Sequence, residues 1–217
     1  MKGVVFSAQN ATNAEVLASI LSLYVPVGSA VLDLTFSKGR FWAGSHVDRY
    51  QVWKNDLFSK EAEHHHDLRV AGEHFPHSKF SAVVLDPPYV VRGRDVESKT
   101  TVIRYGRGVQ DQRRMTSSDF RDGRLDAVGL LYREGAEQAR SLLKGGGVLI
   151  LKTQDEIRSG RFVPKGLVHL QLDGYRLEDI FIVIPPSRPV WDPKWKNQQH
   201  ARKNHSYFLV HRLERRS

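Results

Sequence analysis

Short apolar runs that alternate with segments of helical spacing constrain the fold of this chain more than any other feature. The apolar runs are short, as strands are, and are bounded by turn residues or charges. Alternation of this kind predicts an α/β fold, with a mostly parallel sheet and helices on both of its faces. The predicted strands are SAVLDLTF (29–36), RYQVWKND (49–56), FSAVVLD (80–86) and GGGVLILKTQD (145–155), the last one after a glycine turn.

Helical spacing predicts a first helix over residues 13–25, with Asn13 as its N-cap. A long helix is expected within 117–143, most clearly from Arg124 to Leu143. Two further apolar segments, 176–184 and 205–213, indicate a closing antiparallel pair. Because no linker interrupts this pattern and 217 residues suit one α/β domain, a single domain over 1–217 is expected.

The charge balance indicates a polyanionic partner. Lys and Arg number 33 against 24 Asp and Glu, for a net charge of +9. An excess of this size favours nucleic acid as the partner, although a basic enzyme without such a partner is the alternative. The chain has no cysteine, no apolar run long enough for a membrane helix and no secretory pattern, so a cytoplasmic protein is expected.

Two basic segments, 90–123 and 185–204, interrupt the α/β pattern as long loops. Their basic side chains are interleaved with aromatic residues, which combines phosphate contacts with stacking surfaces. Solvated loops are the alternative. The predicted nucleic-acid-binding residues are Arg92, Arg94, Arg104, Arg107, Arg113 and Arg114 in the first loop, and Lys194, Lys196, Arg202 and Lys203 in the second.

The strand over 80–86 ends in Asp86-Pro87-Pro88-Tyr89. Ligands of open α/β sheets collect beyond the carboxyl ends of strands, where this tetrad lies. The prolines stiffen the backbone and leave carbonyl groups as fixed acceptors. A carboxylate with a nearby carbonyl suits a planar –NH2 group, and Tyr89 offers a face to a flat ring. The tetrad therefore predicts a site that grips an aromatic amine, whereas a solvated Pro-Pro turn is the alternative reading.

Other site types find little support. His64, His65 and His66 are consecutive, and consecutive side chains of an extended chain point apart, so no metal is predicted. The glycines at 145–147 precede a strand and lack the residues of a phosphate loop. A serine-hydrolase elbow is absent as well.

The tetrad resembles the catalytic motif of S-adenosylmethionine-dependent amino-methyltransferases of the DPPY type. Further blocks resemble a group of small DNA methylase-like proteins of actinobacteria and their phages. The matching blocks are VLDLTFSKGRFW (31–42), DPPY (86–89), GGVLILKTQD (146–155) and HARKNHSYFLV (200–210). The resemblance implies a class I, Rossmann-like methyltransferase fold, whose seven-stranded sheet ends in a C-terminal antiparallel pair.

The same resemblance implies S-adenosyl-L-methionine as cofactor and assigns roles to individual residues. Asp86, Pro87, Pro88 and Tyr89 would be catalytic. The turn after the first strand, where Ser37 and Lys38 depart from the family's small residues, would pass the methionine part. Asp56 would hold the ribose and Asp67 the adenine amine. The full set of implied cofactor residues is Asn10, Thr12, Asp33, Thr35, Phe36, Gly39, Asp56 and Asp67.

The resemblance implies methylation of an exocyclic amine of a base, with adenine N6 in DNA preferred. Cytosine N4 in DNA, or adenine N6 or guanine N2 in RNA, are alternatives. An alternative of another class is a catalytically silent nucleic-acid-binding partner subunit. Gln154 and Asp155, which end a strand at the same edge as Asp86, either line the base site or are a polar strand end.

Overall fold

The computed structural model describes residues 4–44, 46–87, 127–158, 161–164, 172–186, 200–201 and 203–214. The basic segment 90–123 lies outside these residues, as does most of 185–204. No helix in the described part of the chain combines the length and apolar character that a membrane crossing needs.

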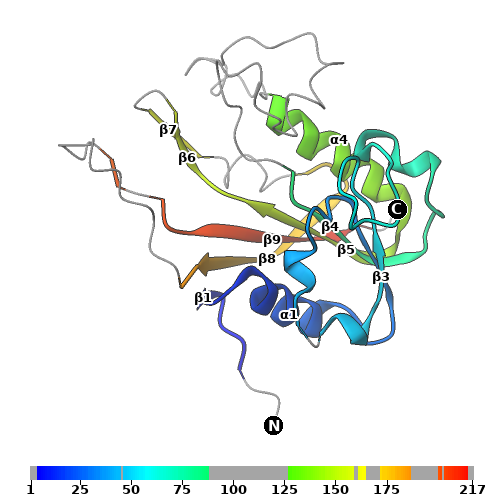
Figure 1. Ribbon diagram of the computed structural model, residues 1–217, viewed down its shortest axis with the longest axis horizontal. Helices are drawn as coiled ribbons and strands as arrows, with labels where there is room; N and C mark the ends of the chain where they lie inside the picture. The colour runs from blue at the N-terminus through cyan, green and yellow to red at the C-terminus, as the bar shows by residue number, and fades with distance from the viewer. Residues whose placement is uncertain are drawn as a thin grey trace.

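A seven-stranded sheet forms the centre of the fold, in the order β1-β8-β9-β5-β4-β2-β3 (Figure 1). Neighbouring strands run parallel except at β9, which is antiparallel to both β5 and β8. The mostly parallel sheet with a C-terminal antiparallel pair is thereby confirmed. The strands are β1 (Ala8–Asn10), β2 (Ala30–Asp33), β3 (Gln51–Lys54), β4 (Phe80–Leu85), β5 (Leu143–Thr153), β8 (Tyr175–Ile184) and β9 (Ser206–Leu213).

Helices cover both faces of the sheet, because the central strands are apolar on both sides. Side chains along a strand alternate between the faces. In β4, Ala82 and Val84 pack in the core under α1 (Asn13–Tyr24), whereas Val83 and Leu85 pack under α4 (Ala127–Leu142). Figure 1 shows the two helices on opposite sides of the strands.

The first helix begins with a capping box that corrects the predicted N-cap. Thr12, and not Asn13, is the N-cap: its hydroxyl accepts the backbone N–H of Glu15. The Glu15 carboxylate in turn accepts the backbone N–H of Thr12 at 2.7 Å. Threonine with glutamate three residues later satisfies two helix-end donors at once, which Asn13 cannot do from its position.

The predicted turn at the three glycines is wrong. The glycines lie inside β5, where the pairing with β4 jumps from Phe80–Leu143 to Ala82–Val148 and residues 144–147 bulge out. Gly146 takes a φ of 76° there, a conformation that favours glycine.

Other short elements were not predicted either. They are β1, the hairpin of β6 (Glu156–Arg158) and β7 (Arg161–Val163), and the 3-10 helices η1 (Arg40–Trp42), η2 (Val47–Arg49) and η3 (Leu68–Glu73).

Candidate active site at the carboxyl edge of the sheet

The carboxyl ends of β2 and β4 meet where the strand order reverses. From β2 the chain continues to β3 on one side and later to β4 on the other side of β2. Open α/β sheets bind ligands in the crevice outside the strand ends at such a point. Asp86 and Pro87 follow β4 directly there, Asp86 half-buried and Pro87 buried. This edge is therefore the candidate active site.

Hydrogen bonds join the turn after β2 to the start of the tetrad. Asp33 accepts the indole N–H of Trp42 at 2.7 Å and the backbone N–H of Thr35 at 2.9 Å. The hydroxyl oxygen of Thr35 accepts the backbone N–H of Asp86 at 2.7 Å. The turn predicted to pass the cofactor is thus bonded to the segment predicted to bind the target amine.

Negative charge gathers at this edge. Asp33 is only 2% exposed, and burial raises the pKa of its carboxyl to about 7. The bonds from Trp42 and Thr35 act to lower this pKa, while the charges of Asp86 and Asp56 raise it further. Like charges disfavour each other's ionised form, and a nearby cation relieves that cost. A cation close to Asp33 would therefore stabilise its ionised form.

Asp56 holds the turn from beyond the end of β3. One of its carboxylate oxygens accepts the backbone N–H groups of Phe58 at 2.9 Å and Ser59 at 2.8 Å. The other, Oδ2, accepts the backbone N–H of Ser37 at 2.9 Å. A carboxylate offers about four acceptor positions. One position on Oδ2 therefore takes no bond from the described residues and is left for a hydroxyl group.

Hydrogen bonds hold Ser37 in a backbone conformation that favours glycine. Ser37 takes a φ of 52°, a conformation that costs a side-chain-bearing residue free energy. Its N–H is held by Asp56, and its carbonyl accepts the hydroxyl of Ser59. Gly39 takes a φ of 66°, and a larger residue does not fit there, because a Cβ would lie 2.7 Å from the ring of Phe36.

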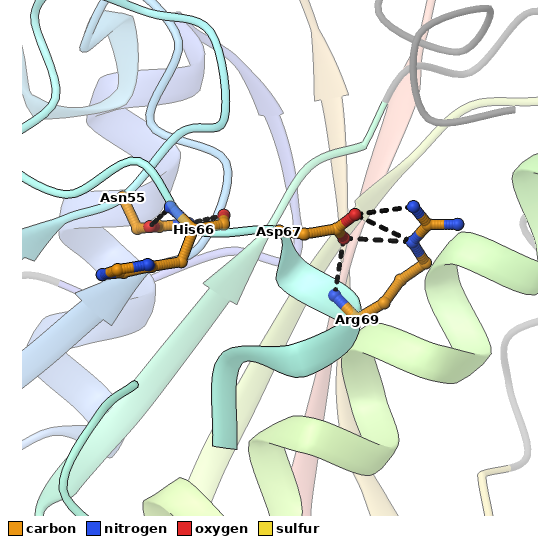
Figure 2. A network of polar contacts seen from close by, with 4 residues as sticks. All are labelled: Asn55, His66, Asp67 and Arg69. Carbon is orange, nitrogen blue, oxygen red and sulfur yellow. Dashed lines mark hydrogen bonds and ion pairs between the residues drawn. The ribbon is translucent and has the colours of Figure 1, made fainter. Parts of the chain in front are cut away.

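Asn55 is a buried residue to which the sequence analysis assigned no role. Its amide donates to the carbonyl of Leu34 at 3.1 Å and to that of His66 at 3.0 Å, and it accepts the N–H of His66 at 2.9 Å. Figure 2 shows the paired bonds to His66. Asn55 thereby ties the ends of β2 and β3 to the segment before η3.

Asp67 lies beside this network but is already paired. Its carboxylate accepts three bonds from the guanidinium of Arg69, the shortest at 2.6 Å, and one from the Arg69 backbone N–H (Figure 2). Burial acts to raise the pKa of Asp67, but the bonds from Arg69 outweigh it and the pKa is lowered. An adenine amine would have to share this carboxylate with Arg69.

Asn10 and Thr12 are not brought to the same place. Asn10 ends β1, which is separated from β4 by three strands. With neighbouring strands about 4.8 Å apart, the two strand ends lie roughly 19 Å from each other. The side chain of Thr12 is engaged in the capping box of α1. The structure thus groups Asp33, Thr35, Phe36, Gly39, Asp56 and Asp86, and leaves these two residues apart.

Trp42 and Lys152 are further residues of this edge that the sequence reasoning did not assign. Trp42, in η1, supplies the indole N–H that Asp33 accepts. Lys152 is 1% exposed near the carboxyl end of β5. A lysine inside the apolar run VLILKT was a usable signal, because charged residues are almost never fully buried unless paired. The bond from Trp42 to Asp33 crosses a turn whose shape could not be predicted, so no comparable signal pointed to Trp42.

The carboxylate of Asp155 is hydrogen-bonded to a residue of β9. Its carboxylate accepts the hydroxyl of Tyr207 at 3.0 Å, and that hydroxyl also contacts the imidazole of His205 at 2.8 Å. Burial, together with the bond to Asp155, raises the pKa of Tyr207 to about 12. Asp155 is 8% exposed and therefore lies against β9. This position favours the reading of Asp155 as a structural strand end.

Two of the three consecutive histidines, His64 and His66, belong to an aromatic stack. The ring of His66 stacks on His74 with centroids 4.0 Å apart, and His64 stacks on Trp53 at 5.7 Å. Within the described ranges, no group of three or more His, Asp or Glu side chains is placed to hold a metal ion.

Several predicted site residues lie outside the described residues. They include Pro88 and Tyr89 of the tetrad. Of the predicted nucleic-acid contacts, Lys203 alone falls within the described part, where its ammonium lies 4.4 Å from the ring centroid of Phe162 in β7. The others outside are Arg92, Arg94, Arg104, Arg107, Arg113, Arg114, Lys194, Lys196 and Arg202.

Solved structures share this architecture, although no protein-family model and no curated protein matches the chain. TrmN from Thermus thermophilus aligns with a TM-score of 0.52 and 16% identity, over 91% of this chain and 48% of TrmN. The N-methyltransferase NodS from Bradyrhizobium japonicum aligns with a TM-score of 0.51 and 11% identity, over 93% of this chain and 94% of NodS. The chain has a class I methyltransferase fold. It spans about half the length of TrmN.

At identities this low, the likeness extends to the methyltransferase fold and not to the substrate. The methyltransferase fold agrees with the fold that the DPPY resemblance implied. Its carboxyl edge carries the bonded turn and the tetrad's first two residues at the strand-order reversal. Function has to be argued from that edge.

Proposed function

We propose that the chain is an S-adenosyl-L-methionine-dependent methyltransferase that acts on an exocyclic amine of a nucleic-acid base. Adenine N6 in DNA is the preferred target, as the DPPY motif implies. The observation that carries the proposal is the bond from the Asp86 N–H to the Thr35 hydroxyl at the strand-order reversal. It connects a cofactor turn and an amine-binding motif at one point, as transfer between two ligands requires.

The residues of the edge fit this cofactor. Its sulfonium carries a positive charge, which the carboxylates of Asp33 and Asp56 would balance. The remaining acceptor position on Asp56 suits a ribose hydroxyl, and the half-buried ring of Phe36 gives the turn an apolar face. When bound, the cofactor supplies an electrophilic methyl group.

The tetrad's part is to hold and activate the target amine. The carboxylate of Asp86 and the carbonyl of Pro87 would accept the two N–H bonds of the amine. This arrangement would draw the nitrogen toward sp3 geometry and make its lone pair available to the methyl carbon. As the nitrogen–carbon bond forms, the carbon–sulfur bond of the donor would break, the thioether product would leave, and the nitrogen would release one proton to solvent. Tyr89 would stack on the base. The gain is in position and electrostatics, so no metal or covalent intermediate is required.

The nucleic-acid partner is proposed on charge. The net charge of +9 and the basic segments 90–123 and 185–204 would supply phosphate contacts. In duplex DNA the target base is stacked and paired, so it has to swing out of the helix to reach Asp86 and Tyr89.

Calorimetry with S-adenosyl-L-methionine tests the proposal at its first step. We expect binding by the wild-type protein and nearly equal affinity in Asp86→Ala, because Asp86 acts on the amine. The same variant should lose methyl transfer to DNA. Absence of binding heat at millimolar cofactor would overturn the proposal, and wild-type turnover in Asp86→Ala would show that the tetrad is only a turn.

A further inference from the structure

Lys152 lies next to the position that Asp86 takes directly after β4. The parallel pairing of β4 with β5 places Val84 opposite Ile150 and Leu85 opposite Leu151. Asp86 is the next residue after Leu85 and Lys152 the next after Leu151, so the same register brings the two together. Neighbouring strands are about 4.8 Å apart. Val84 and Ile150 both pack in the core under α1, and residues two positions further along a strand point to the same face. Asp86 and Lys152 therefore share one face at the carboxyl edge.

Within the described residues, the groups in direct contact with the ammonium of Lys152 are uncharged. The side chain is 1% exposed. Its ammonium binds the hydroxyl of Ser206 and lies 4.7 Å from the ring centroid of Phe208, both on β9. From α4, the hydroxyl of Tyr132 binds the backbone carbonyl of Lys152. A hydroxyl and a ring offset only part of the cost of burying an ammonium.

Asp86 supplies the opposite charge. The described groups around Lys152 come from the end of β4, from β9 and from α4. Among them, Asp86 is the one whose charge acts on the ammonium. Burial lowers the pKa of Lys152 to about 8, and the charge of Asp86 opposes that shift. The two groups consequently favour each other's ionised form.

We propose that Lys152 is a positioning residue that supplies the buried counter-charge of Asp86 and keeps this carboxylate ionised beside the target amine. The inference rests on the proposed function, which gives Asp86 its role toward the amine. It adds a residue on a different strand, which acts through Asp86 and does not touch the substrate.

The pH dependence of methyl transfer tests the inference with Lys152→Met, Lys152→Arg and the control Lys144→Met. Lys144 lies exposed near the other end of the same strand. In Lys152→Met we expect the acid limb of the profile to move up by about one to three pH units, as loss of a neighbouring opposite charge does.

The variant Lys152→Arg keeps the positive charge, so it separates an effect of charge from an effect of packing. A guanidinium stays ionised, so Lys152→Arg should keep the acid limb of the wild type. Lys144→Met should keep the whole wild-type profile. An unchanged profile in Lys152→Met, or an equal displacement of the acid limb in Lys152→Arg, would overturn the inference.

A measurement without turnover keeps the inference apart from the proposed function. The carboxyl carbon of Asp86 is titrated by NMR in the wild type and in Lys152→Met, with Asp86→Asn for assignment. The midpoint should rise in Lys152→Met, and an unchanged midpoint overturns the inference. If the wild type transfers no methyl group, the proposed function fails, and this titration still decides the role of Lys152.

Discussion

Replacing Thr35 by valine removes the hydroxyl that joins the cofactor turn to the tetrad. The shape of the side chain is nearly kept, but the backbone N–H of Asp86 loses the acceptor that lies 2.7 Å away. An unsatisfied buried donor costs about 1–3 kcal/mol, and this bond is only partly buried. We therefore expect Thr35→Val to lower the free energy of unfolding by about 1–2 kcal/mol.

Thr35→Ser is the matched control, because it keeps the hydroxyl and loses one methyl group. Urea denaturation with linear extrapolation measures the stability of both variants. The rate of methyl transfer should fall about tenfold or more in Thr35→Val, because the hydroxyl positions Asp86 relative to the cofactor turn and small displacements of reacting groups lower rates by such factors. The reasoning is refuted if Thr35→Val matches the wild type in stability and rate, or if Thr35→Ser loses as much as valine does.

Three further predictions concern charges. The pKa of Asp33 is raised to about 7, so its contribution to stability is complete below about pH 4 and is lost as the pH rises through 7. Urea midpoints should therefore fall over this range in the wild type and less steeply in Asp33→Asn; equal slopes would contradict the raised pKa. Asp56→Ala should weaken cofactor binding about ten- to a hundredfold in calorimetry, for a lost acceptor worth about 1.5–3 kcal/mol, and an unchanged affinity would remove Asp56 from the ribose site. Arg113→Ala with Arg114→Ala should flatten the log–log salt dependence of DNA affinity by roughly 0.9 per lost contact in fluorescence anisotropy, with cofactor affinity unchanged. An unchanged slope would show that these arginines make no phosphate contact. The predicted contacts would then have to come from Lys194, Lys196, Arg202 and Lys203.

The sheet could be predicted because its central strands carry their own signal. β2 and β4 are buried on both faces, so each appears in the sequence as a nearly continuous apolar run. The short elements carry no such signal. β1 has three residues, and its pairing with β8 depends on a segment more than 160 positions away. Local spacing cannot reveal a strand that distant pairing creates.

The residues of the candidate site also differ in how well the sequence predicts them. Asp86 could be placed because it ends a predicted strand, and Asp33 because the resemblance assigns it to the turn after the first strand. The contacts that define their environment could not be, since Trp42, Asn55 and Lys152 reach them across turns or from other strands. The bonds that hold Ser37 in its left-handed conformation also come from a different strand end. Residue types were thus readable from the sequence, and their partners were not.

Nucleoside mass spectrometry tests the proposed methyl transfer most directly. DNA and RNA are incubated separately with the protein and S-adenosyl-L-methionine that carries a labelled methyl group, and the digested nucleosides are compared between the wild type and Asp86→Ala. We expect labelled N6-methyladenine from DNA with the wild type and none with Asp86→Ala. Label on cytosine N4 or on an RNA base would assign a different substrate. The absence of labelled nucleosides from both DNA and RNA would contradict the proposed activity.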